Sequence, residues 1–228
     1  RMLEVIATCA SDVEKIVAGG GERIELVSSL SEGGLTPSKA LIEYAVTVAG
    51  KIPVMVMIRP HAMGFVYSAA DLSIMEKDID TAFTCGAHGV VLGALTEQGV
   101  VDEKAIARLL PHAQGKSVTF HRAIDQSNNP LESLRTILCY PFDRVLTSGG
   151  SGKIMENVTV LKEMMDIGRG KITVLAGGGV TIKNVSALIN ETGVTEIHVG
   201  TAVRDGFDPL NPILPNLIKD ILKQIQHG

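Results

Sequence analysis

The chain has 228 residues, of which 45% are hydrophobic and 20% charged, and its formal net charge at pH 7 is −4. This is a globular composition without clustered Lys and Arg and without an apolar run of the roughly 18 residues that cross a bilayer, so we expect no nucleic-acid or membrane partner. There are three cysteines, and the wide spacing of Cys9, Cys85 and Cys139 predicts free thiols and not a disulfide framework. The N-terminal segment lacks the pattern of a secretory signal, so we expect the protein in the cytoplasm.

Short runs rich in β-branched residues alternate with helix-period segments along the whole chain. The predicted strands are residues 3–7, 23–27, 53–59, 89–92, 117–121, 143–147, 172–176 and 196–199. Their starts lie about 20 to 35 residues apart, the length of one strand–helix unit. Eight such units without a linker predict one α/β domain, residues 1–228, with the (β/α)8 architecture of a TIM barrel. A doubly wound open sheet is the alternative, because the sequence does not reveal a reversal of strand order.

Local signals mark three helices. Ser38, in Thr-Pro-Ser at residues 36–38, is a predicted N-cap. Ser68 precedes a helix predicted for residues 70–85, and Gly86 follows it as the C′ residue. A last helix is predicted after Pro212, and its apolar stripe should pack against the barrel. The stripe comprises Ile213, Leu214, Leu217, Ile218, Ile221, Leu222 and Ile225.

Alternation along the strands predicts which side chains face the barrel interior, because successive residues of a strand point to opposite sides. In residues 54–59 the valines and Ile58 suit the helix-facing side, which sends Arg59 inward. The same alternation sends His121 inward at the end of 117–121, and Glu25 inward in 23–26. The other residues predicted to face inward are Glu4, Arg23, Met55, Met57, Ser117, Thr119, Glu196 and His198.

Charged side chains inside a barrel need partners or a function, because burying an unpaired charge costs several kcal/mol. A network of buried ion pairs, for example Glu4 or Glu25 with Arg23, would be a purely structural arrangement. In this fold, however, catalytic groups lie at the C-terminal ends of the strands. We therefore predict Glu25, Arg59 and His121 as residues of one site at the barrel mouth.

Small-residue turns follow the last three strands. The segments AGGGV (176–180) and HVGTA (198–202) occupy the usual phosphate site of β/α barrels, although a tight turn without a ligand would use the same residues. The predicted phosphate-binding residues are Gly177, Gly178, Gly179, Gly200 and Thr201. After strand six, RVLTSGGSGK (144–153) offers the hydroxyls of Thr147 and Ser148 and several backbone amides, unless it is a plain flexible loop.

Taken together, these motifs resemble those of the CutC family, which is named for copper homeostasis. The matching segments are RIELVSSLSEGGLTPS (23–38), IPVMVMIRP (52–60), FVYS (65–68), TFHRAID (119–125), NPLESL (129–134), RVLTSGG (144–150) and AGGGV (176–180). The resemblance implies a β/α barrel in the cytoplasm, a homodimer, and Cu⁺ as the bound ion. It also implies a shared set of mouth residues, which are Glu25, Arg59, His121, Arg122, Thr147 and Ser148.

The sequence departs from the family pattern where copper ligands would be expected. Members of the family often carry cysteines at the positions of Ile6 and Val27, and an acidic residue at the position of Gly64. Cu⁺ prefers two or more thiolate or thioether ligands close together. Cys9 follows the first strand and is the one cysteine that could reach the mouth, whereas the other two follow helices and should lie at the opposite face. His198 offers an imidazole, but no closely spaced ligand motif accompanies it.

An enzyme acting on a small phosphorylated or carboxylated metabolite is the alternative to copper handling. Arg59 would clamp the anionic group, His121 would act as general acid or base, and Glu25 would orient it or transfer a second proton. Arg122 would stabilise developing negative charge. This points to isomerase or lyase chemistry, without a Schiff base because no lysine ends a strand. A non-catalytic scaffold or regulator is the third class, and the sequence does not decide whether the protein is an enzyme.

Overall fold

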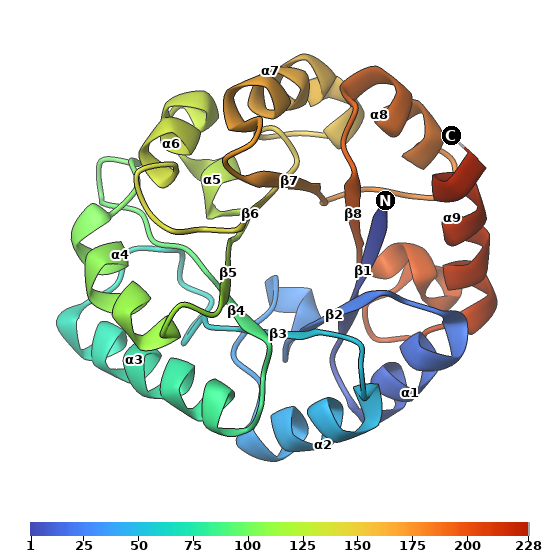
Figure 1. The fold of residues 1–228 in the computed structure, drawn as a ribbon, viewed down its shortest axis with the longest axis horizontal. Helices are drawn as coiled ribbons and strands as arrows, with labels where there is room; N and C mark the ends of the chain where they lie inside the picture. The colour runs from blue at the N-terminus through green and yellow to red at the C-terminus, as the bar shows by residue number, and fades with distance from the viewer. Residues whose placement is uncertain (228) are drawn as a thin grey trace.

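Eight parallel strands close into a ring in chain order in the computed structural model, which describes residues 1–227 (Figure 1). The strands are β1 (Met2–Ala7), β2 (Arg23–Leu26), β3 (Val54–Met57), β4 (Gly89–Leu92), β5 (Ser117–Phe120), β6 (Arg144–Thr147), β7 (Thr173–Ala176) and β8 (Glu196–Val199). The α-helices are α1 (Ala10–Gly19), α2 (Lys39–Ala49), α3 (Ala69–Thr84), α4 (Glu103–Leu109), α5 (Ala123–Gln126), α6 (Pro130–Ile137), α7 (Val158–Gly168), α8 (Val185–Thr192) and α9 (Pro215–His227). The helices form an outer layer around the strands (Figure 1).

Closure of the ring decides between the two predicted architectures. β1 pairs in parallel with β2 on one side and with β8 on the other, so that Glu4 has Arg23 and His198 as register partners. An open doubly wound sheet would leave two edge strands. The TIM barrel prediction is therefore confirmed.

The predicted alternation is also confirmed. Val54, Val56 and Ile58 belong to the core between the strands and the helices. Met55 and Met57 belong instead to an inner apolar cluster, together with Ile6, Val27 and Val91. The first four strands thus contribute an apolar cluster to the barrel interior, and polar side chains occupy many of the other interior positions, alongside Leu146 at the cavity.

The predicted caps of α2 and α3 are present. The Ser38 hydroxyl accepts a hydrogen bond from the Leu41 N–H at 3.2 Å. Ser68 forms a reciprocal capping box with Asp71, and Gly86 follows the helix with a φ of +91°.

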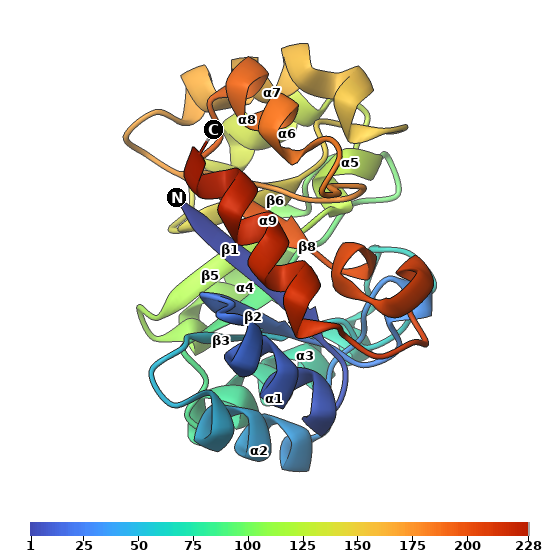
Figure 2. The same ribbon diagram turned by 90° about the vertical axis from the view of Figure 1, so that its right-hand side faces the viewer.

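The last helix differs from the prediction. α9 begins at Pro215 and not directly after Pro212. Ile213 instead forms an isolated antiparallel bridge with Arg204, and the following proline suits the first turn of a helix. α9 lies across the outside of the barrel beside β1 and β8 and packs between α1 and α8 (Figure 2). Within residues 1–227, no helix is both long and apolar enough to cross a membrane.

A buried ion pair ties the segment after β8 to the start of α1. Nη2 of Arg204 lies 2.6 Å from Oδ2 of Asp12, and both side chains are almost fully buried. The same Asp12 oxygen accepts from the Thr8 N–H at 2.8 Å. Arg204 and Asp12 therefore fix the loop at the C-terminal end of β1 relative to the chain that leads into α9.

Candidate functional site

A cavity of about 420 Å³ opens at the C-terminal ends of the strands. It is large enough for a small metabolite. Most of the residues predicted from the sequence border it. They are Glu25, Arg59, His121, Arg122, Gly178, Gly179, Gly200 and Thr201. Three predicted residues do not border it, namely Gly177, Thr147 and Ser148.

Arg59 follows β3 and holds the loop after β2 over the mouth. Its Nη1 donates to the carbonyl oxygens of Glu32 at 2.8 Å and Gly34 at 3.3 Å. The guanidinium carbon lies 4.8 Å from the centre of the Phe65 ring. The side chain has no carboxylate partner among the described residues, and its buried Nε has no hydrogen-bond acceptor there. Arg59 therefore keeps an unused donor and an uncompensated positive charge at the cavity.

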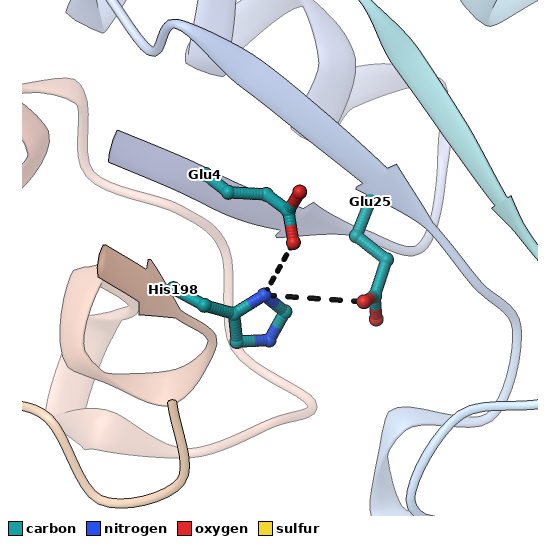
Figure 3. A group of neighbouring side chains, drawn as sticks. All are labelled: Glu4, Glu25 and His198. Atoms are coloured by element: carbon teal, nitrogen blue, oxygen red, sulfur yellow. Dashed lines mark hydrogen bonds and ion pairs between the residues drawn. The ribbon is translucent and has the colours of Figure 1, made fainter. Parts of the chain in front are cut away.

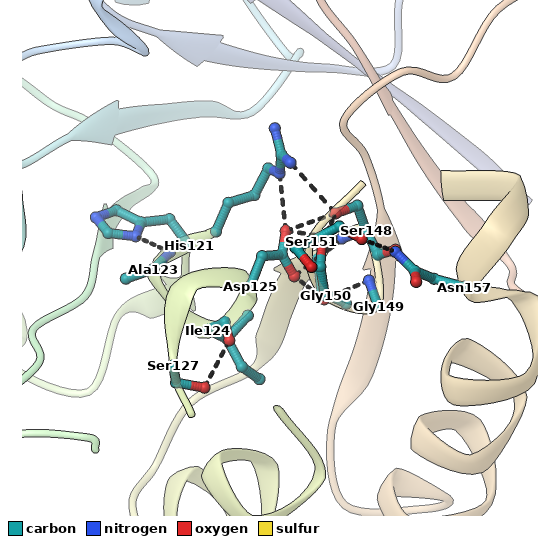
Figure 4. A network of polar contacts seen from close by, with 12 residues as sticks. His121, Ala123, Ile124, Asp125, Ser127, Ser148, Gly149, Gly150, Ser151 and Asn157 are labelled. Carbon is teal, nitrogen blue, oxygen red and sulfur yellow. Dashed lines mark hydrogen bonds and ion pairs between the residues drawn. The ribbon is translucent and has the colours of Figure 1, made fainter. Parts of the chain in front are cut away.

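His121 follows β5 and is held in one orientation. Its Nδ1 accepts a hydrogen bond from the Ala123 N–H at 3.1 Å, which places the proton of the neutral ring on Nε2 (Figure 4). Gly93 allows this position, because a Cβ atom there would come within 2.7 Å of the ring. Burial, together with the positive charge of Arg59, lowers the pKa of His121 to about 3. His121 is therefore a neutral hydrogen-bond donor at physiological pH.

Arg59 and His121 lie against the same aromatic ring. The His121 ring centre lies 5.0 Å from that of Phe65, the ring on which the Arg59 guanidinium stacks. Nε2 of His121, like Nε of Arg59, is buried and has no acceptor within residues 1–227. Leaving a buried donor without a partner costs about 1–3 kcal/mol. Two residues that carry such donors, border one cavity and lie against the same aromatic ring are an arrangement suited to the oxygen atoms of a ligand.

Glu25, Glu4 and His198 come together at the floor of the cavity, from β2, β1 and β8 (Figure 3). Nδ1 of His198 lies 2.6 Å from Oε1 of Glu4 and 3.9 Å from Oε2 of Glu25. Burial raises the pKa of Glu25 to about 7. Although burial opposes ionisation of Glu4, the hydrogen bond and charge of His198 and the charge of Arg23 lower its pKa to about 2. Burial opposes protonation of His198 as well, but the two carboxylates raise its pKa.

Below this cluster lies the structural ion-pair network that the sequence suggested. Arg23 contacts Glu4 and Glu196, each at 2.5 Å, and Nε of Arg144 lies 3.2 Å from the same Glu196 oxygen. Glu25 does not belong to this network. The interior charges therefore divide into a paired lower layer and a partly unpaired upper layer that borders the cavity.

Asp125 is the functional residue that the sequence reasoning missed. Its carboxylate accepts from the Thr147 hydroxyl at 2.5 Å, from the Ser148 N–H at 3.0 Å and hydroxyl at 2.9 Å, and from Nε of Arg122 at 2.9 Å (Figure 4). Thr147 and Ser148 are fully buried and use their hydroxyls to hold this carboxylate. The only available signal was the aspartate in TFHRAID. An aspartate near the start of a helix is common in proteins and does not by itself indicate a functional site.

The glycine turn after β7 brings backbone close to Arg122. A Cβ atom at Gly178 would come within 2.4 Å of the Arg122 guanidinium carbon, and both Gly178 and Gly179 have positive φ angles. Their N–H groups have no acceptor in the described part of the chain. Arg122, oriented by Asp125, and these two amides together form a second group of donors at the cavity.

The thiols do not form a site. Cys9 is exposed at the start of α1 and does not border the cavity, and Cys85 and Cys139 follow α3 and α6 at the opposite face. Ile6 and Val27, the positions at which the resemblance led us to expect cysteines in other family members, lie in the inner apolar cluster. One thioether, Met57, borders the described cavity, and no thiol does. The donor set is therefore poor for Cu⁺ and rich in groups that bind anions.

Comparisons with known proteins agree with this barrel. The CutC family model matches residues 1–203. A Homo sapiens relative named copper homeostasis protein cutC homolog is 40% identical over 197 residues, which are 85% of this chain and 72% of that protein. A CutC family protein of Rhizobium meliloti (strain 1021) is 40% identical over 196 residues, or 86% of this chain and 79% of the relative. The crystal structure of a Streptococcus agalactiae CutC protein, 35% identical, superposes with a TM-score of 0.83 and covers 87% of this chain and 97% of that one.

Proposed function

The chain belongs to the CutC family, and on that premise we propose that it serves copper homeostasis in the cytoplasm through a barrel mouth that binds a small anionic molecule. The observation that carries this proposal is that Arg59 and His121 border one cavity and that each has a buried donor, Nε and Nε2 respectively, without an acceptor among residues 1–227. A carboxylate or phosphate bound there would supply oxygen acceptors for these donors. Because hydrogen bonds to charged groups are the strong ones, such a ligand would offset the cost of burying the two donors.

The second group of donors favours a ligand with more than one polar group. Arg122 and the amides of Gly178 and Gly179 border the same cavity as Arg59 and His121. Guanidinium groups and free backbone amides suit phosphate and carboxylate oxygens. A small phosphorylated or carboxylated metabolite therefore fits the size and the chemistry of the mouth.

Direct Cu⁺ binding by thiolates is not supported by the residues at the mouth. The names of the human relative and of the Streptococcus agalactiae structure connect the family with copper, and a Cu⁺ titration under reducing conditions tests whether this chain shares that property directly. We expect no tight stoichiometric binding, and the same weak background in a Cys9→Ser variant. Tight binding of one ion per chain that depends on Cys9 would contradict the proposal.

Proton transfer on the bound molecule is a second candidate function. Glu25 borders the cavity with a carboxylate oxygen that has no hydrogen-bond partner among the described residues. A neutral His121 would stabilise an oxyanion formed on the ligand, as hydrogen-bond donors do in enzymes that form enolates. This is chemistry of the isomerase or lyase type. Incorporation of solvent deuterium into a bound ligand would test it, and Glu25→Gln should abolish the exchange while the ligand still binds.

A matched pair of arginine variants tests the anion site. Thermal shift and calorimetry with inorganic phosphate and with a panel of phosphorylated and carboxylated metabolites should show binding to the wild-type protein. Arg59→Gln should weaken binding by at least about tenfold, as should His121→Leu, because each removes a donor to a charged oxygen. Arg108→Gln, on the outer surface beside Glu76, should leave binding unchanged. Equal affinities in all four proteins would refute the site, and light scattering on the same samples tests the homodimer that the family resemblance implies.

A further inference from the structure

Three side chains at the cavity floor form a cluster that the anion site does not use. Glu4, Glu25 and His198 each offer one ligand atom, and these atoms lie within 4.8 Å of one another (Figure 3). The strand order produces this arrangement, because β1 lies between β2 and β8. Glu4 is the register partner of His198, and Glu25 is the partner of Ile6, the next inward position on β1. Three neighbouring strands therefore direct one donor each at the same point.

Glu25 provides an independent indication of a ligand. Its side chain is 97% buried, and its Oε2 has no hydrogen-bond partner among residues 1–227. This oxygen points toward Nδ1 of His198 but lies 3.9 Å away, beyond hydrogen-bond distance (Figure 3). Buried polar atoms in native proteins are nearly always partnered. A cation between Glu25 and His198 would supply the partner.

We propose that Glu4, Glu25 and His198 bind one divalent transition-metal ion of the Zn²⁺ type. One imidazole nitrogen and two carboxylate oxygens are ligands that Zn²⁺ and Cu²⁺ accept, whereas Cu⁺ prefers sulfur. Zn–N and Zn–O distances of about 2.0–2.2 Å place neighbouring ligand atoms roughly 3–4 Å apart. The present separations of 2.6 and 3.9 Å bracket that range. The ion would replace the proton in the hydrogen bond between His198 and Glu4, and the released proton would go to solvent.

The surroundings support the cluster as a metal site. Nε of Arg23 donates to Oε2 of Glu4 at 2.5 Å, which orients the carboxylate and leaves Oε1 directed at the cluster. Glu25 and His198 border the cavity, so an ion can enter from the mouth. Three protein ligands would leave one coordination position facing the cavity.

This inference goes beyond the proposed function, because metal binding is measured without any organic ligand. A wild-type protein that fails to bind anions could still bind Zn²⁺, and one that fails to bind Zn²⁺ could still bind anions. Proton transfer by Glu25 and coordination by Glu25 use the same oxygen, so a bound ion would replace the proton-transfer role.

Calorimetry with Zn²⁺ on the full chain, treated with a chelator and kept reduced, tests the site. His198→Gln and Glu25→Gln remove one ligand each. The control is His112→Gln, because His112 lies on the surface 3.1 Å from Glu76 and 2.9 Å from Asp80 and would be the natural place for non-specific binding. Wild-type and His112→Gln proteins should bind one Zn²⁺ per chain with equal affinity. The affinity should fall about 100-fold in His198→Gln and at least about tenfold in Glu25→Gln.

Repeating the titration with other ions tests the donor set. After removal of the reductant, Cu²⁺ should bind more tightly than Zn²⁺, and Mn²⁺ more weakly. Under reducing conditions, Cu⁺ should bind the wild-type protein no more tightly than it binds the Glu25→Gln variant. The proposal is overturned by a wild-type protein that binds no Zn²⁺, by full affinity in Glu25→Gln, or by a loss of binding in His112→Gln. If circular dichroism shows that His198→Gln does not fold, Glu25→Gln decides the matter, since glutamine preserves the shape of the side chain.

Discussion

Replacing His121 with glutamine should make the protein less sensitive to acid. The ring is 3% exposed, and burial together with the charge of Arg59 lowers its pKa to about 3. In the unfolded chain the ring returns to its ordinary pKa of 6.5. Stability is therefore fully present above pH 6.5. It falls as the pH drops toward 3, because the unfolded state binds a proton that the native state does not.

The magnitude follows from these two pKa values. At about pH 5, proton uptake by His121 favours the unfolded state by about 2 kcal/mol, and at about pH 7.5 its effect is close to zero. Urea unfolding of both proteins at these two pH values measures the difference. Between the two pH values, the wild-type protein should lose about 2 kcal/mol more than His121→Gln does. The remaining ionisable groups are common to both proteins and cancel in the comparison. Equal losses would refute the buried, neutral His121 on which the anion site depends.

Gly178→Ala should weaken phosphate binding and lower the melting temperature, because φ is +94° there and a Cβ atom would lie 2.4 Å from the neighbouring guanidinium carbon. Phosphate titration and thermal melting check both effects. Arg204→Met should reduce the free energy of unfolding by about 3–5 kcal/mol, since it leaves the buried Asp12 carboxylate unpaired. Urea unfolding measures this loss, and adding Asp12→Asn should recover part of it. A chain with Ile6→Cys and Val27→Cys should gain Cu⁺ affinity in competition with a Cu⁺ chelator, because both positions lie in one interior cluster. Unchanged affinity would show that the cysteines alone do not make a copper site.

The interior positions of the strands could be predicted because strand geometry is local. A side chain's face follows from its parity within the strand, so Val56 and Val118 on the outside placed Arg59 and His121 inside. Because both residues lie at the C-terminal ends of strands, they could also be predicted to lie at the barrel mouth. The roles of Thr147 and Ser148 could not be predicted in the same way. Whether a hydroxyl faces a ligand or a neighbouring side chain depends on where its acceptor lies in space.

The sequence by itself determined the eight strand–helix units, the inward side chains and the glycine turns, because each depends on a periodic or short-range property of the chain. Only the tertiary structure decided which inward groups are partnered. Ring closure brings His198 against Glu4, 194 positions away along the chain, while Glu25 and Arg59 keep unpartnered polar atoms. Burial then shifts the pKa values of His121 and Glu25, because desolvation depends on the residues that surround a side chain in the folded protein and not on its neighbours in sequence.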